Sequence, residues 1–213
     1  MALFPSISYP AARLIIGVTY VVGTAGMLWP YSRPLFVWMT PYHLLLVSAL
    51  FFLQHPGRAW LPVALAVYGL GFGVEVLGVQ THFPFGAYAY GPVLGIQLWG
   101  TPLLIGLNWL LLVAAANSLP RLHRLVPPPW RALLAALLLL LLDVCMEPVA
   151  IALDMWRWQA PTPPLQNYLA WFVLALLFSL LWQYKAPTRT NPLAPWVLGM
   201  QFLFFATLAL FLA

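Results

Sequence analysis

The stretch Ala132–Leu153, ALLAALLLLLLDVCMEPVAIAL, decides the fold of this chain. An apolar run of about 20 residues is long enough to cross the roughly 30 Å hydrocarbon core of a bilayer as a helix. This run contains no basic residue, and two acids, Asp143 and Glu147, interrupt it toward its end. The stretch therefore predicts a transmembrane helix that carries two carboxyl groups.

Similar apolar stretches recur along the whole chain of 213 residues, of which 63% are hydrophobic and 6% charged. A soluble domain is about a quarter charged, so the composition excludes a soluble fold. The sequence predicts an all-α integral membrane protein, a bundle of about seven transmembrane helices in a single domain, residues 1–213. We expect the spans at Ala11–Leu28, Leu35–Leu53, Trp60–Val79, Val93–Ala116, Ala132–Leu153, Tyr168–Tyr184 and Leu193–Leu212.

Basic residues near the span ends predict the orientation, because cytoplasmic loops are enriched in lysine and arginine. With seven spans, Arg33 and Arg157 fall on one side of the membrane. The other side carries Arg13, Arg58, Arg121, Arg124, Arg131, Lys185 and Arg189. This pattern predicts a cytoplasmic N-terminus and an outer C-terminus. We expect the membrane to be a prokaryotic cytoplasmic membrane. Because the basic residues are spread over short connections, the net charge of +5 indicates topology and contact with membrane lipid, with no nucleic acid partner.

The connection after the third span, Gln80–Pro92 (QTHFPFGAYAYGP), is rich in aromatic residues. Such residues concentrate where a membrane meets water. We expect an aromatic interfacial loop, and composition alone leaves open whether it faces a ligand. Two prolines, Pro41 and Pro102, fall inside predicted spans, where each is expected to kink its helix.

The chain contains only four acids: Glu75, Asp143, Glu147 and Asp154. An ionisable residue within a membrane span is costly to keep and indicates a functional site. Asp143 and Glu147 are one helical turn apart on the same face, Asp154 roughly continues that stripe, and Glu75 is expected at a similar depth. Carboxyl groups close together in an apolar setting disfavour a second negative charge, so we expect one to keep its proton as a general acid beside a general base.

The residues alone leave three interpretations of these acids open. They could catalyse a reaction, carry protons in a transporter, or pair structurally, as Asp154 could with Arg157. Other kinds of site lack their usual residues. A retinal Schiff base requires a lysine in the last span, and the only lysine lies elsewhere. No aspartate-rich cluster is present to bind a diphosphate through magnesium. The four histidines are scattered and there is one cysteine, so no metal-ligand or haem spacing occurs. We therefore expect chemistry without a metal or another cofactor.

Two segments carry a resemblance to a known family. The first is Glu75–Trp109, EVLGVQTHFPFGAYAYGPVLGIQLWGTPLLIGLNW, with an E-x-x-G-V-x-x-x-x-P-F-G-x-Y-x-Y core. The second is Asp143–Trp171, DVCMEPVAIALDMWRWQAPTPPLQNYLAW, with its D-x-x-x-acid-P-V-A and W-x-W elements. Together they resemble the carotenoid biosynthesis protein family, the membrane hydratases of the carotenoid 1,2-hydratase (CruF) type.

The resemblance implies an enzyme that adds water to the terminal double bond of an acyclic ψ end group in a long polyene. The substrate would be a carotenoid such as lycopene, γ-carotene or a C50 precursor, and other enzymes of the carotenoid pathway are conceivable partners. The chain departs from the family in having Glu147 where aspartate is expected in many relatives, and it is short for the family.

Hydration of such an alkene begins with protonation at C2, which leaves a tertiary cation at C1. We expect Asp143 and Glu147 to act as the acid and the water-activating base, with Glu75 as a third member of the site. The substrate-binding candidates are polar or have π faces that stabilise a cation: Tyr88, Tyr90, Trp99, Asn108, Trp156, Trp158, Asn167 and Trp171.

Two other functions stay open on the sequence. A lycopene-cyclase-like enzyme would also protonate a ψ end group but would capture the cation with an internal alkene. A carotenoid or lipid carrier, or a proton-coupled transporter, would use the same carboxyl groups without changing the carotenoid.

Overall fold

The computed structural model describes residues 7–55, 57–186 and 190–212, and it is mostly helical. Six of its helices are long and apolar enough to cross a membrane: α1 (Tyr9–Leu28), α2 (Arg33–Leu53), α3 (Leu61–Thr81), α6 (Pro128–Ala152), α7 (Leu165–Lys185) and α8 (Ala194–Leu212). These helices confirm six of the predicted spans to within a few residues. The chain is accordingly an integral membrane protein.

The fourth predicted span, Val93–Ala116, is wrong in its first half. Only Leu103–Asn117 is helical there, as α4, and the preceding residues form a small hairpin of β2 (Gln97–Leu98) and β3 (Thr101–Pro102). A helix of 15 residues is about 22 Å long, shorter than a bilayer core. Pro102 is the N-cap of α4, so it kinks no helix, whereas Pro41 does lie inside α2.

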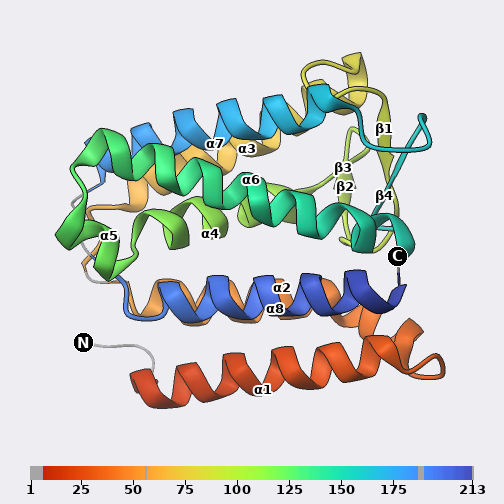
Figure 1. Ribbon diagram of the computed structural model, residues 1–213, viewed down its shortest axis with the longest axis horizontal. Coiled ribbons are helices and arrows are strands. Elements are labelled where there is room, and N and C mark those ends of the chain that lie inside the picture. The colour runs from red at the N-terminus through yellow and green to blue at the C-terminus, as the bar shows by residue number, and fades with distance from the viewer. Residues whose placement is uncertain (1–6, 56, 187–189, 213) are drawn as a thin grey trace.

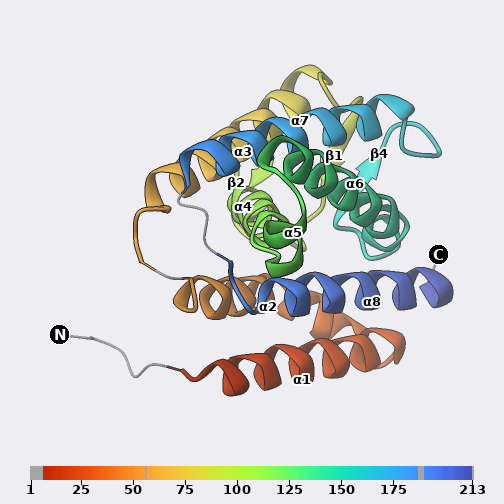
Figure 2. The same cartoon turned by 60° about the vertical axis from the view of Figure 1, so that its left-hand side comes forward.

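The short helix α4 is the centre of the bundle (Figure 2). It contacts α2, α3, α6, α7 and α8, and nearly all of its second half is buried. Helix α1 is at the edge and packs on α2 and α8. A helix surrounded by other helices need not match the thickness of the lipid, and the two residues just before it, Thr101 and Pro102, are buried in protein.

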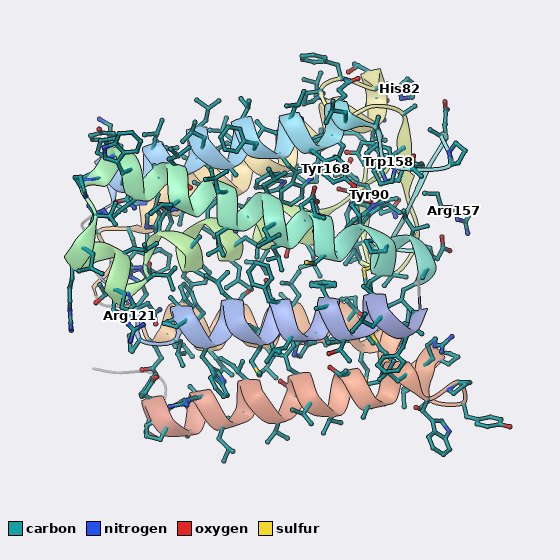
Figure 3. The ribbon with its side chains drawn as sticks, viewed as in Figure 1. His82, Tyr90, Arg121, Arg157, Trp158 and Tyr168 are labelled. Atoms are coloured by element: carbon teal, nitrogen blue, oxygen red, sulfur yellow. The ribbon has the colours of Figure 1, made fainter. Side chains whose placement is uncertain are left out.

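Consecutive membrane helices run in alternate directions, so α1 begins at the end of the bundle opposite to where α8 ends (Figure 1). The short helix α5 (Pro120–Leu125) lies at the end where α1 begins. Arg121 and Arg157 occupy opposite ends of the bundle (Figure 3), as the alternation requires. Arg189 lies outside the described residues, and which end faces the cytoplasm stays a prediction.

A two-stranded ribbon closes the other end of the bundle. Strand β1 (Tyr88–Tyr90) follows α3, and strand β4 (Trp156–Trp158) follows α6; the two pair antiparallel, with Tyr88 opposite Trp158 and Tyr90 opposite Trp156. The expected aromatic loop after α3 thus contains a strand held by a segment nearly 70 residues away. This ribbon covers the buried carboxyl groups.

Candidate functional site

Three carboxyl groups converge beneath the ribbon. Glu75 comes from α3, and Asp143 and Glu147 come from successive turns of α6. Their side chains are 3%, 1% and 3% exposed, so they are withdrawn from solvent and lipid alike. No ion pair to any of them occurs among the described residues, and their stabilisation comes from hydrogen bonds instead.

Glu75 accepts three short hydrogen bonds. The Tyr88 and Tyr90 hydroxyls donate to its Oε2 at 2.6 and 2.7 Å, and the Trp109 indole donates to its Oε1 at 2.8 Å. The Trp109 ring stacks on Trp171 with a centroid distance of 4.1 Å, which fixes its donor. These three donors stabilise the negatively charged form of Glu75.

Tyr88 can approach Glu75 closely because a glycine, Gly78, lies one turn later on α3. A Cβ atom on Gly78 would lie 2.7 Å from the Phe85 ring and 2.9 Å from the Tyr88 hydroxyl. Only a residue without a side chain leaves room for both aromatic groups at this point of the helix.

Glu147 also accepts three hydrogen bonds, but they are longer. The indoles of Trp156 and Trp158 both donate to Oε2 at 3.0 Å, and the Asn167 amide donates to Oε1 at 3.2 Å. The same Asn167 nitrogen donates to Oδ2 of Asp143 at 3.3 Å, so this one side chain from α7 bridges both acids of α6. Oδ1 of Asp143 is buried with no hydrogen-bond partner among the described residues.

The alternation of side chains along the two strands directs four donors to the carboxyl groups. Successive strand residues point to opposite faces, so the Y-A-Y and W-R-W patterns place Tyr88, Tyr90, Trp156 and Trp158 on one face. In Figure 3, Tyr90 and Trp158 point toward the bundle, whereas Arg157 points away from it. The ribbon is thus a polar cover whose inner face is built entirely from neutral donors.

The two phenols remain donors over a wide pH range. Burial raises the pKa of Tyr90 well above its usual range, and the Glu75 charge raises it further. Burial and Glu75 likewise raise the pKa of Tyr88.

A small pocket lies between Glu75 and Glu147, with Asn167 and the ribbon aromatics in its walls. Its volume is about 20 Å³, which is enough for one water molecule. Water needs two to four polar partners in such a place, and this pocket offers carboxylate, phenol, indole and amide groups.

A much larger apolar cavity, of about 350 Å³, adjoins the small pocket. Ile105 and Trp156 line both, so they form the shared wall. Val18 and Val22 of α1 and Tyr42 of α2 also line the large cavity and are at least half exposed. The cavity therefore opens sideways between α1 and α2, toward the region that lipid would occupy.

The structure brings together most of the residues that the sequence indicated. Glu75, Glu147, Tyr88, Tyr90, Trp156, Trp158, Asn167 and Trp171 all line the small pocket, and Asp143 lies directly behind Asn167.

Two indicated residues lie elsewhere. Trp99 is 64% exposed at the turn between β2 and β3, where its φ is 53°, and it does not line the pocket. Asn108 lines the large cavity instead. Asp154, the acid with the weakest case, is half-buried and forms an ion pair with Arg157 at 2.6 Å.

Sequence reasoning missed Trp109 and Phe85 as members of the site. An indole in an apolar helix resembles an ordinary core residue, and only its position as the last residue of the first quoted motif could have indicated a role. No group of three His, Cys, Asp or Glu residues in the described part of the chain is arranged to hold a metal ion.

Comparison with known proteins adds a relationship in sequence. Residues 37–213 match the profile of the carotenoid biosynthesis protein family. Over 135 residues the chain is 29% identical to bisanhydrobacterioruberin hydratase of Haloarcula japonica. That alignment covers 57% of this chain and 43% of the relative, so the chain spans less than half of the relative's length. No solved structure matches this chain.

Proposed function

This chain belongs to the carotenoid biosynthesis protein family, and we propose that it is a cofactor-independent carotenoid hydratase. It would add water across the terminal C1–C2 double bond of an acyclic ψ end group in a long polyene. The observation that carries the proposal is a water-sized pocket between two buried carboxyl groups, beside an apolar cavity that opens toward lipid. The name of the Haloarcula japonica relative supports the same reaction class.

The large cavity suits the hydrocarbon part of the substrate. Its volume lies within the range of ordinary ligand pockets, and only one end of a carotenoid fits inside it. The rest of the polyene would extend through the opening between α1 and α2 into the membrane. The terminal alkene would then reach the shared wall at Ile105 and Trp156 and face the carboxyl groups.

The hydrogen-bond lengths favour one pocket carboxyl group as the acid and the other as the base. Glu75, with three donors at 2.6–2.8 Å, is the better stabilised anion, and Glu147, with donors at 3.0–3.2 Å, is the easier one to protonate. We assign Glu147 as the acid that protonates C2. Asp143, buried with one amide donor and an unpartnered oxygen, would hold a reserve proton behind it, because an unpaired buried charge is costly.

Protonation breaks the C1–C2 π bond, forms a C–H bond at C2 and leaves a tertiary cation at C1. The faces of the ribbon aromatics and the Glu75 charge would stabilise this cation. The water in the small pocket attacks C1, and the resulting oxonium loses a proton to Glu75. One water molecule is added, and return of the proton to Glu147 resets the site.

The polar pocket favours this reaction over cyclisation. A cyclase must keep water from the cation so that an internal alkene captures it, whereas this pocket offers polar partners for a water molecule beside the site of protonation.

The test is expression in a host that accumulates lycopene, followed by chromatography with mass detection. The proposal expects a product heavier by one water molecule for each hydrated end. An isomer of unchanged mass would identify a cyclase instead. Unaltered pigment, with the protein folded in the membrane and a γ-carotene host giving the same result, would favour a carrier or transporter.

A further inference from the structure

The end of the bundle opposite the ribbon carries basic side chains, and the four acids of the chain all lie far from it. On α6, Asp143 is about 15 residues, or about 22 Å, beyond the start of the helix. On α3, Glu75 is about 14 residues, or about 21 Å, beyond the start. Glu147 and Asp154 lie further still from this end. The end that holds α5 therefore presents positive charge without a carboxylate side chain.

Two arginines of α5 are exposed at this end. Arg121 and Arg124 are three residues apart, so they are neighbours on the surface of the helix. Neither forms an ion pair or a side-chain hydrogen bond within the described residues. Figure 3 places Arg121 at the extreme end of the bundle. The two guanidinium groups can therefore donate together to one anion, such as a phosphate group.

Large apolar side chains adjoin these arginines. Leu125, the last residue of α5, is 78% exposed, and Trp130, in the first turn of α6, is 61% exposed. With 25 residues α6 is about 37 Å long, which exceeds the roughly 30 Å hydrocarbon core, so its first turn can reach the headgroup layer. Tryptophan is enriched at that depth. Cations beside apolar side chains are typical of a segment that lies in the membrane interface.

Other basic residues at this end lack the same setting. Arg131 follows Trp130 directly but is buried, so it does not belong to the exposed pair. Arg58 is exposed in the connection between α2 and α3, with no second arginine near it in the sequence. Figure 2 shows this connection apart from α5. Arg58 therefore separates an effect of α5 from an effect of general positive charge.

We propose that α5 and the first turn of α6 bind an anionic phospholipid. Its phosphate lies between Arg121 and Arg124, and its acyl chains lie beside Leu125 and Trp130. Charge complementarity selects the anionic headgroup, and the exposed apolar side chains favour a lipid over a soluble acidic partner. The inference goes beyond the proposed function and does not depend on the reaction.

Two lipids with the same acyl chains test the headgroup preference. Purified protein in detergent is titrated with palmitoyl-oleoyl phosphatidylglycerol, which is anionic, or with palmitoyl-oleoyl phosphatidylcholine, which has no net charge. The shift of the thermal unfolding temperature gives a half-maximal concentration for each lipid. The ratio of the two concentrations is compared between wild type and variants, because the partition of each lipid into detergent is the same for all of them.

We expect Arg121→Gln and Arg124→Gln each to lower the preference for phosphatidylglycerol about fivefold, the effect of one arginine beside an anionic lipid surface. Arg58→Gln removes the same charge at the same end and is expected to leave the preference unaltered. The unfolding temperature in phosphatidylcholine shows that each variant is folded. An equal loss in all three variants would reveal a general attraction to positive charge and overturn the site, as would an unchanged preference in both α5 variants.

Inorganic phosphate distinguishes a lipid from a free anion. We expect it to give no shift that depends on Arg121 and Arg124, because it has no acyl chains to place beside the apolar side chains. A phosphate-induced shift as large as that of phosphatidylglycerol, and lost in both α5 variants, would identify a free anion as the ligand and overturn the lipid assignment.

Discussion

Tyr88 and Trp158 lie directly opposite each other in the β1–β4 ribbon, with ring centroids 5.2 Å apart, and each donates a hydrogen bond to a different buried carboxyl group. Tyr88 bonds Glu75 of α3, and Trp158 bonds Glu147 of α6. The ribbon therefore links two acids from different helices, between which no hydrogen bond occurs among the described residues. We therefore expect different effects from three kinds of substitution: at the carboxyl groups, in the space beneath the ribbon, and at the ribbon phenols.

Removal of the acid function should stop the reaction and leave the protein folded. Glu147→Gln keeps the shape of the side chain but has no proton to give, and general acid catalysis is worth about 100-fold or more. We expect Glu147→Gln and Glu75→Gln to lower hydrated carotenoid at least about 100-fold, and Asp143→Asn to have a smaller effect. Asp154→Asn is the matched control, because Asp154 does not line the carboxyl pocket and pairs with Arg157 instead. A fully active Glu147→Gln protein would refute the assigned role.

A methyl group added at Gly78 of α3 should disturb the packing around Glu75. In Gly78→Ala the new Cβ atom meets Phe85 and the Tyr88 hydroxyl, so we expect overpacking to cost about 1–3 kcal/mol of stability and to move Tyr88 away from Glu75. Gly73→Ala, in the same helix, meets nothing within 4 Å and should leave activity and unfolding temperature unchanged or slightly raised. Product yield and thermal unfolding of the two variants are compared. Equal behaviour would show that the tight contact at Gly78 is unimportant.

The ribbon phenols should make stability fall at high pH. Burial and Glu75 raise the pKa of Tyr88 and Tyr90 above the usual 10.0, so the folded protein keeps these protons where the unfolded chain releases them. The free energy of unfolding should therefore be insensitive to these groups below about pH 9 and fall as pH rises beyond about 10. Thermal unfolding across this range should show a shallower fall in Tyr90→Phe. Tyr31→Phe, at a side chain that is 91% exposed, should reproduce the wild-type slope.

The two ends of the chain should report from opposite sides of the membrane. Because α1 begins at one end of the bundle and α8 ends at the other, a reporter at the C-terminus should be outside when one at the N-terminus is cytoplasmic. The distribution of basic residues gives the sidedness. Reporters on the same side would mean that α4, despite its central place, does not complete a crossing.

Much of the fold could be predicted because apolar length is a local property. Six spans follow from it, and the four-residue spacing of Asp143 and Glu147 correctly places both acids on one face of α6. The prediction of the fourth span is wrong in its first half because the apolar composition of residues 93–102 is also compatible with a helix, whereas in the structure these residues form a hairpin in which residues 95–100 are exposed.

The rest of the site depends on contacts between distant segments. The Y-A-Y and W-R-W patterns have the two-residue period of strands, but each is too short to be recognised alone, and only their pairing shows that four aromatic residues face the acids. From the sequence, Trp99 has the same kind of aromatic side chain as these residues and was predicted to bind substrate with them. In the structure Trp99 lies at a hairpin turn that the sequence does not reveal, and its side chain is exposed.

The inner face of the ribbon has a consequence for charge. Its phenols and indoles surround Glu75 and Glu147 with donors that are all neutral, and the nearby arginine, Arg157, is turned outward to Asp154. Within the described residues the carboxyl groups therefore form half of an ion pair with no permanent counterion. A carbocation that forms beside them would be the missing half for as long as it lasts. After capture by water the site would again hold one unpaired carboxylate, and an uncharged alcohol would leave into the lipid.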